Sequence, residues 1–199
     1  MDDAFITHIL HVMEQLLSYD KYAFKIINYE WSNSFFDWLM PWLRNSVMWN
    51  PLYLFLILLV TINFKKTGWW WIVFAAGTVI LTDFVSSSII KHNIIRLRPC
   101  NDPDIASWIK VLVGYRPQSS SFTSSHATNH FGMAMFLYLT LKTRFDTWPA
   151  LFFFWAFGIS FAQIYVGVHY PVDIICGGLI GILIGYLSGK SFNKNYGLV

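Results

Sequence analysis

The sequence is short of charged residues, since Asp, Glu, Lys and Arg make up only 13% of its 199 positions, whereas roughly a quarter is usual in soluble domains. It holds two cysteines, whose spacing matches neither a disulfide framework nor a metal-binding cluster. The formal net charge of +3 is too small to indicate a nucleic-acid partner. The opening residues "MDDAF" are acidic rather than basic, so we expect no cleavable signal peptide. The shortage of charge excludes an ordinary soluble domain.

Apolar and aromatic residues take the place of the missing charge. Hydrophobic residues make up 55% of the chain and aromatic residues 19%, including ten Trp. Trp and Tyr concentrate at membrane–water interfaces, because an amphipathic ring suits the headgroup layer. The composition therefore predicts an integral membrane protein that has the lipid bilayer as a partner.

Five stretches are apolar enough for a spanning helix and close to the required length of about 20 residues. They are residues 49–64, 68–90, 125–141, 148–167 and 172–189. The predicted fold class is all-α, a polytopic membrane bundle of about five transmembrane helices within a core of residues 49–190. Small residues in the last stretch, "GGLIGILIGYLSG", favour close helix packing in lipid.

The N-terminal region, residues 1–48, has apolar positions at helical spacing with polar residues between them. This pattern is typical of short amphipathic helices that lie in the membrane interface. Asp20 and Ser32 stand where helix N-caps are expected. The first of these helices is alternatively a sixth span. Residues 191–199 form the remaining segment, a predicted cytoplasmic tail.

Basic residues beside the spans predict the orientation. They follow the first, third and fifth spans and fall on one side, which we assign to the cytoplasm: Lys65, Lys66, Lys142, Arg144, Lys190 and Lys194. The loop 91–124 and the turn 168–171 then face outward. The outer loop is basic too, with Lys91, Arg96, Arg98, Lys110 and Arg116. Because the count of basic residues is therefore ambiguous, the assignment supposes that the outer cations serve a site.

The first polar cluster on the outer side is "KHNIIRLRP". Lys91 and Arg98 are seven residues apart, a spacing that places both on one face of a helix. Pro99 disfavours helical conformation at Arg98, so the helix is expected to end there. Two cations directed at one point indicate an anion between them, although cations that anchor a helix end among headgroups have the same pattern.

The second cluster is "SSSFTSSHATNHFG". Thr123 or Ser124 is a suitable N-cap for the third span. A helix N-terminus with free backbone N–H groups binds phosphate readily, and His126 lies in the first turn, where it can donate a proton. A capped helix with an incidental interfacial histidine is the alternative interpretation.

The third cluster is "VGVHYPVDIICGG". If a helix resumes near Tyr170 or Pro171, His169 stands at its start and Asp173 lies one turn further on. A carboxylate there can hold one imidazole nitrogen and leave the other as a nucleophile. By itself the pair is equally explained as a structural contact, but together the three clusters supply what phosphoryl transfer requires.

The three clusters resemble the signature of the type 2 phosphatidic acid phosphatase and vanadium haloperoxidase superfamily, Lys-x6-Arg-Pro, Pro-Ser-Gly-His and Ser-Arg-x5-His-x3-Asp. Lys91, Arg98 and Pro99 fit the first motif in full. In the second motif Ser124 and His126 fit, whereas Thr123 and Ser125 replace Pro and Gly. In the third, His169 and Asp173 fit, whereas Ala162 and Gln163 replace Ser and Arg. The order and spacing agree, and the matched core covers residues 50–190.

The resemblance implies a role for each matched residue. His169 attacks phosphorus and forms a phosphohistidine, Asp173 orients it, and His126 protonates the leaving group and later activates water. The phosphate is held by Lys91, Arg98, Ser124 and backbone N–H groups near Ser125. No metal or other cofactor is implied. The implied substrate is a membrane lipid phosphate at the periplasmic face of a bacterial inner membrane, of the phosphatidate, phosphatidylglycerol phosphate, undecaprenyl diphosphate or lipid A class.

Gln163 is the main departure from the signature, because it replaces an arginine that would bind phosphate bidentately. Gln163 can still donate hydrogen bonds to phosphate, and Arg116 or Arg96 is a candidate for the missing cation. Two functions compete: a lipid phosphatase, and a catalytically weakened relative that binds lipid phosphates. The retained His126, His169 and Asp173 favour the enzyme. A haloperoxidase fits poorly with a membrane-embedded chain.

Asp83 lies inside the second predicted span, where a charge is costly and often functional. It precedes Lys91 by eight residues, or roughly 12 Å along a helix axis, which places it too deep to touch the phosphate. We expect a structural role, with a hydrogen bond to His130 or Asn129. The sequence does not determine the oligomeric state.

Overall fold

The structure, a computed structural model, describes residues 3–198; the first two residues of the predicted N-terminal region and the last residue of the predicted tail lie outside this range. Its α-helices are α1 Asp3–Lys25, α2 Ser34–Leu43, α3 Asn50–Asp83, α4 Lys91–Asn93, α5 Ser125–Phe145, α6 Leu151–Tyr165 and α7 Pro171–Asn195. Wider helical turns, Ile26–Glu30 and Phe84–Ile90, extend α1 and α3. No strand occurs among the described residues, so the all-α prediction is confirmed.

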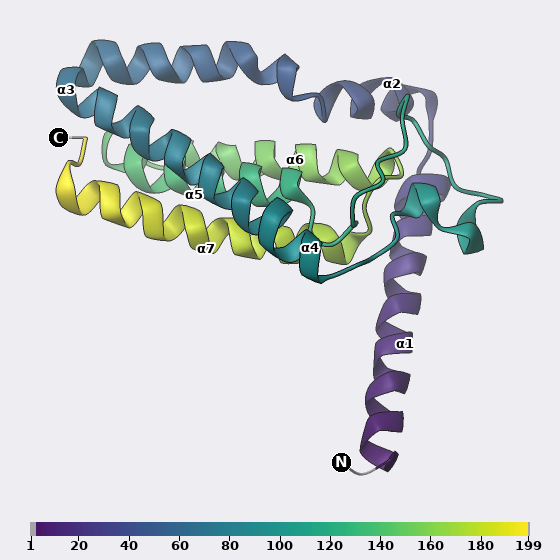
Figure 1. The fold of residues 1–199 in the computed structure, drawn as a ribbon. Helices are drawn as coiled ribbons and strands as arrows, with labels where there is room; N and C mark the ends of the chain where they lie inside the picture. The colour runs from purple at the N-terminus through teal and green to yellow at the C-terminus, as the bar shows by residue number, and fades with distance from the viewer. Residues whose placement is uncertain (1–2, 199) are drawn as a thin grey trace.

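α3 is two helices joined by a sharp reversal. Lys65 has non-helical angles of φ 47° and ψ −119°, and the second arm turns back at this point and diverges from the first (Figure 1). Within residues 3–198, three helical segments are long and apolar enough to cross a membrane: Ser46–Asn93, Trp148–Tyr165 and Pro171–Asn195. The first of these contains both predicted spans 49–64 and 68–90.

α5 contains the predicted span 125–141. Polar residues in its first turns keep its hydropathy below that of the three segments that are apolar enough to cross a membrane. α7 begins at Pro171, one of the two starts expected for it, and runs beyond the predicted end at residue 189, to Asn195. The helix continues because its last turns still pack, with Phe192 fully buried. The Arg144 side chain also donates a hydrogen bond to the carbonyl of Leu198.

α5 and α7 form the closest helix pair of the bundle. A Cβ atom added at Gly181 would lie 2.2 Å from the carbonyl oxygen of Thr128, and one at Gly185 would lie 2.1 Å from that of Gly132. Only glycine permits this approach, since real Cβ atoms do not come so near a backbone oxygen. The close packing predicted from the small residues of the last span is confirmed.

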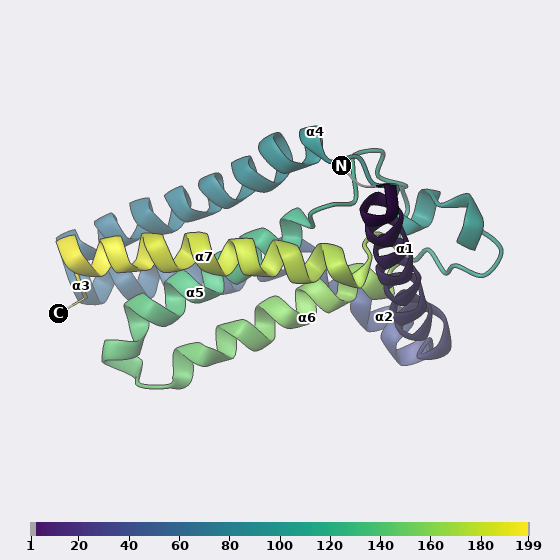
Figure 2. The ribbon, with the colours of Figure 1, turned by 90° about the horizontal axis from the view of Figure 1, so that it is seen from below.

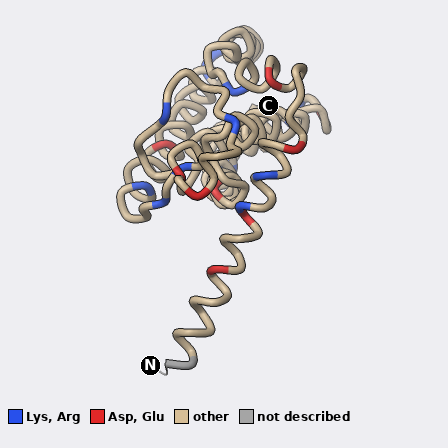
Figure 3. The backbone as a smooth tube through the Cα atoms, turned by 90° about the vertical axis from the view of Figure 1, so that its right-hand side faces the viewer, with Lys and Arg blue, Asp and Glu red and all other residues tan. Residues whose placement is uncertain are grey.

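α1 extends away from the bundle and crosses the direction of the other helices (Figures 1 and 2). Figure 3, which views the molecule from the end that carries α1, shows few charged positions along its projecting part. Several of its apolar side chains are exposed, including Phe5, Leu10, Met13, Leu16 and Leu17. This arrangement suits a helix that lies across a membrane surface at that end of the bundle.

The two expected N-caps of the N-terminal region were wrong. Helix α1 continues through Asp20, because that carboxylate accepts hydrogen bonds from Arg96 and from the backbone N–H of Val172 instead. α2 is capped by Asn33 rather than Ser32, with the Asn33 side chain accepting from the N–H of Phe36 at 3.0 Å.

Candidate active site

His169 lies in the short turn between α6 and α7 and is 2% exposed. Its backbone N–H donates to the carbonyl of Gln163, which fixes the turn. The Nη1 atom of Arg98 lies 3.0 Å from Nε2 of the imidazole. Nδ1 lies 3.5 Å from a carboxylate oxygen of Asp173 and 3.5 Å from the hydroxyl of Ser121. The two ring nitrogens therefore face different groups, a cation on one side and acceptors on the other.

Asp173 is fully buried in the first turn of α7 and is held from several sides. Its carboxylate accepts hydrogen bonds from the N–H of Tyr170 at 2.9 Å, from the hydroxyl of Ser121, and from Nη1 of Arg96 at 2.6 Å. α7 begins at Pro171, as predicted, with Tyr170 as its N-cap. The structure thus brings Asp173 and His169 together, and also makes Asp173 part of the cap of α7.

Burial keeps His169 neutral. It lowers the pKa of His169 from 6.5 to about 4; the hydrogen bond with Asp173 opposes this shift, while the nearby positive charge of Arg98 adds to it. A neutral imidazole has a free lone pair on one nitrogen. The side chain is therefore in the state that a nucleophile needs at neutral pH.

Arg98 reaches the site from an extended segment and not from a helix, so the expectation of a shared helical face with Lys91 was wrong. α4 ends at Asn93, and Ile94 already has extended angles. Pro99 has the predicted effect, since Arg98 is extended with φ −76° and ψ 151°. The guanidinium is fixed by Ser119, through its carbonyl and its hydroxyl, and by the carbonyl of Val168 at 3.1 Å.

Lys91 meets the N-terminus of α5 despite the early end of α4. Its Nζ donates to the Ser125 hydroxyl at 2.8 Å. Ser124 caps α5, as predicted, with its side chain accepting from the N–H of Ala127. Lys91 and Arg98 are both close enough to His169 to interact with it electrostatically, and the backbone N–H of Ser124 donates to the carbonyl of Asp173.

His126 lies in the first turn of α5 and is partly exposed. It is close enough to His169 and Lys91 to interact with them electrostatically. Its carbonyl accepts a hydrogen bond from His130, and the two imidazole rings stack with centroids 6.1 Å apart. Asn129 donates to Asp83 at 3.3 Å, so one of the two hydrogen-bond partners predicted for Asp83 is confirmed.

Gln163 lies in α6 and is 1% exposed. Its carbonyl accepts the N–H groups of both Val168 and His169, which ties it to the turn that carries His169. Its side-chain oxygen accepts a hydrogen bond from Nε of Arg44 at 3.3 Å. Its Nε2 group is buried, and no hydrogen-bond partner for it occurs in the described part of the chain.

Among the contacts of the described residues, none joins Gln163 to either of the two arginines considered as replacements for the missing cation. Arg96 binds two carboxylates, Asp173 at 2.6 Å and Asp20 at 2.5 Å. Arg116 is exposed, and among the described contacts none joins its side chain to Gln163 or to a histidine of the site. The arginine that does contact Gln163 is Arg44, which sequence reasoning missed.

Sequence reasoning also missed Ser119, Ser121 and Asp20. The serine run 119–121 is separated from the Thr123-Ser124 motif by one residue. Its three neighbouring hydroxyl groups were a usable signal of polar contacts. Asp20 had no such signal, because its partners Arg96 and Val172 are distant in the sequence. Within residues 3–198, no group of three or more His, Cys, Asp or Glu side chains is arranged to hold a metal ion.

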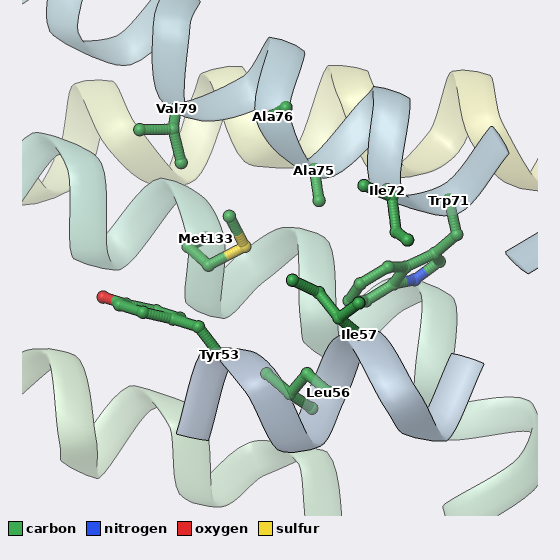
Figure 4. Close-up of a pocket in the computed structure, with 9 residues that line it drawn as sticks. All are labelled: Tyr53, Leu56, Ile57, Trp71, Ile72, Ala75, Ala76, Val79 and Met133. Carbon is green, nitrogen blue, oxygen red and sulfur yellow. The ribbon is translucent and has the colours of Figure 1, made fainter. Parts of the chain in front are cut away.

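An apolar groove of about 200 Å³ lies between the two arms of α3 and is lined by Leu56, Trp71 and Met133 among others (Figure 4). A second cavity of about 500 Å³ shares Tyr53, Val79 and Met133 with it and extends to His130, one turn from His126. The two cavities are therefore neighbours, and the second one reaches Asn129 and His130 in the first turns of α5.

Comparison with known families gives one match over most of the chain. The sequence model of the family described as the PAP2 superfamily matches residues 68–196. The match includes every residue of the three polar clusters and omits the N-terminal region.

Individual relatives agree with this match. The chain is 33% identical to a lipid A 4'-phosphatase of Bacteroides thetaiotaomicron over 77% of this chain and 68% of that protein. It is 29% identical to an undecaprenyl-diphosphatase of Sulfolobus acidocaldarius over 88% of this chain and 79% of that protein.

Two solved structures share the fold. Aquifex aeolicus LpxE has a TM-score of 0.61 and 23% identity, with 84% of this chain and 93% of that chain covered. A PAP2-type phosphatidylglycerolphosphate phosphatase from Bacillus subtilis has a TM-score of 0.66 and 20% identity, with 90% and 87% covered.

Proposed function

This chain belongs to the PAP2 superfamily of phosphatases, and from this premise we propose that it hydrolyses a phosphate group from a membrane lipid through a phosphohistidine on His169. The observation that carries the proposal is the environment of the imidazole. Nε2 faces the Arg98 guanidinium at 3.0 Å, while Nδ1 faces Asp173 and Ser121. A phosphate bound by Arg98 would thus lie beside the nucleophilic nitrogen.

The first chemical step is in-line attack by Nε2 of His169 on phosphorus. The P–N bond forms as the bond to the lipid oxygen breaks, and Asp173 stabilises the resulting imidazolium through the Nδ1 side. Lys91, Arg98 and the N–H groups at the start of α5 neutralise the phosphoryl oxygens. These groups are already fixed by the contacts of Ser119 and Ser125, so little reorganisation is needed during the reaction.

His126 is the proposed general acid and base. It gives a proton to the leaving lipid oxygen in the first step and takes one from water in the second, when water attacks the phosphohistidine and releases inorganic phosphate. Its position in the first turn of α5, on the side of Lys91, suits this role. The His130 ring stacks on that of His126, with centroids 6.1 Å apart.

The lipid chain of the substrate is proposed to occupy the apolar groove between the arms of α3. The cavity next to the groove is lined in part by Asn129 and His130, and His130 lies one helical turn from His126. A phosphate at His169 and a chain in the groove can therefore belong to one molecule. The substrate class includes lipid A phosphates, undecaprenyl diphosphate, phosphatidate and phosphatidylglycerol phosphate, and lipid A 4'-phosphate is the first to test because of the Bacteroides relative.

The proposed topology has five spans, formed by the two arms of α3 and by α5, α6 and α7. The site lies at the end of the bundle that carries α1 and α2, and the reversal of α3 lies at the other end with the C-terminus (Figures 1 and 2). Lys65 and Arg144 lie near that second end, which we assign to the cytoplasm. The site then faces the outside of a bacterial inner membrane.

Phosphate release from a panel of these lipids in detergent micelles, without added metal, tests the proposal. We expect turnover of at least one lipid by the wild type and none by His169→Ala. An exposed, distant change, Lys142→Ala, is the matched control and should leave turnover unchanged. If the folded wild type leaves the whole panel intact, the competing reading of a lipid-phosphate-binding relative is favoured. Equal turnover by His169→Ala would exclude the phosphohistidine.

A further inference from the structure

The side chain of Gln163 is a buried polar group with one half of its amide unused. Its oxygen accepts from Arg44, whereas its Nε2 is buried without a partner among the described residues. A buried donor without an acceptor costs free energy, so such groups in native proteins call for an explanation. The Gln163 backbone holds the turn of His169. The unused donor is therefore carried by the residue whose carbonyl holds the His169 turn, and an oxygen of a phosphate bound at His169 is a candidate acceptor for it.

Arg44 is directed toward the same place. It follows the last residue of α2, where its backbone N–H donates to the carbonyl of Met40. Its Nε donates to Gln163 at 3.3 Å, and its Nη2 donates to the Tyr115 hydroxyl at 3.4 Å. The guanidinium also lies over the Tyr115 ring, 5.9 Å from the centroid. These contacts hold a long, partly exposed side chain against the site instead of leaving it free in solvent.

The charge of Arg44 acts within the site. The guanidinium is close enough to His126 and to Arg98 to interact with both electrostatically. Two cations that are close enough to interact repel each other, and the repulsion is stronger away from bulk water. A dianionic phosphate bound by both Arg44 and Arg98 would offset this repulsion.

We propose that Arg44 is a phosphate-binding residue of this enzyme and that, with Gln163, it replaces the guanidinium that the family signature places at position 163. The positive charge has moved from α6 to the end of α2, and Gln163 positions it while giving its own amide N–H to the phosphate. This inference rests on the proposed phosphatase function. Arg44 lies outside residues 68–196, the part of the chain that the family match covers.

The proposal also assigns a different role to Arg96. Its two carboxylate contacts neutralise it and tie Asp173 to α1, so it positions the nucleophile's partner and does not reach the phosphate. Arg116 remains at the surface. Arg44 is thus the arginine that the geometry favours over both sequence candidates.

A charge-relocation experiment tests the role of Arg44. Arg44→Ala should lower kcat/KM for the lipid phosphate by on the order of 100-fold, the range seen when one preorganised donor to a developing charge is removed. It should also weaken inhibition by inorganic orthovanadate, a phosphate mimic, to a similar extent. The double variant Arg44→Ala/Gln163→Arg returns a guanidinium to the site from α6, and it should recover most of the lost activity and vanadate affinity.

The outcomes of these measurements distinguish a failure of this inference from a failure of the proposed function. A wild type without phosphatase activity contradicts the function itself. An active wild type with unchanged Arg44→Ala activity and unchanged vanadate inhibition overturns the role of Arg44. So does a loss on Arg116→Ala that exceeds the loss on Arg44→Ala. Thermal unfolding of each variant in detergent shows whether it is folded. If Arg44→Ala unfolds, Arg44→Gln serves as the second variant, with the same outcomes.

Discussion

Replacing Arg96 with methionine should weaken both the fold and the nucleophile. Methionine keeps most of the apolar stem and removes the guanidinium, which lies 2.5 Å from Asp20 and 2.6 Å from Asp173. Both carboxylates are almost fully buried, and Arg96 itself is 17% exposed on its side chain. Removing one partner of a buried ion pair costs about 3–5 kcal/mol. The partial exposure of Arg96 places the expected loss near the lower end, about 3 kcal/mol.

The experiment measures both the unfolding midpoint and kcat. If the role of Arg96 were purely structural, kcat of the folded variant would stay unchanged. The midpoint of thermal unfolding, Tm, should fall by roughly 6–12 °C in detergent, which is the shift that such a loss of stability produces in a chain of this size. At a temperature where the variant remains folded, kcat should fall between about 10- and 100-fold with KM nearly unchanged, because a slightly misplaced Asp173 no longer orients His169. Arg96→Met/Asp20→Asn should recover part of the stability, since one of the unpaired carboxylates is gone. A stability within about 0.5 kcal/mol of the wild type, or a change in KM alone, would refute the reasoning.

Three further predictions follow from the site and the bundle. The acid limb of kcat/KM should lie near pH 4 and not near 6.5, because protonation of His169 as the pH falls through its lowered pKa removes the nucleophile; a limb near 6.5 would contradict the burial argument. Between those two values the unfolded state binds more protons at this residue, so unfolding free energy should rise with pH. Gly185→Ala should lower the free energy of unfolding by about 1–3 kcal/mol or more, since the added Cβ would lie 2.1 Å from a backbone oxygen. Gly77→Ala is the control and should be neutral in the same unfolding assay, because a Cβ added there has no atom within 4 Å. Met133→Trp should raise KM for a long-chain lipid phosphate and leave a water-soluble phosphate ester unaffected, because it fills the groove but not the site; equal effects on both substrates would show that the groove does not hold the chain.

Much of the bundle was predictable because its signals are local. Apolar runs located the arms of α3 and helices α5, α6 and α7, and the small residues of α7 indicated its close packing. The reversal within α3 was placed correctly because basic residues at 65 and 66 interrupt the apolar run. The caps of the N-terminal region were not predictable, since Asp20 is used by partners far away in the sequence.

The candidate site was predictable where its motifs are contiguous. His169 with Asp173, and Ser124 with its helix, lie where their spacing indicated. The extended path between Asn93 and Arg98 was missed because no proline or glycine precedes Pro99 in that segment, and the local pattern is equally compatible with a helix. Arg44 was out of reach for a stronger reason: it is 119 residues from Gln163, and only the packing of α2 against α6 brings the two side chains together.

The central claim is that His169 carries the phosphoryl group between lipid and water. The most direct measurement is a single-turnover reaction with a lipid phosphate labelled on phosphorus, quenched in alkali and mapped by mass spectrometry of the peptides. The account predicts a transient label on His169 that disappears as inorganic phosphate is released, and a longer-lived label in His126→Ala. Release of phosphate with no label on His169 at any time, or a label on another residue, would contradict it.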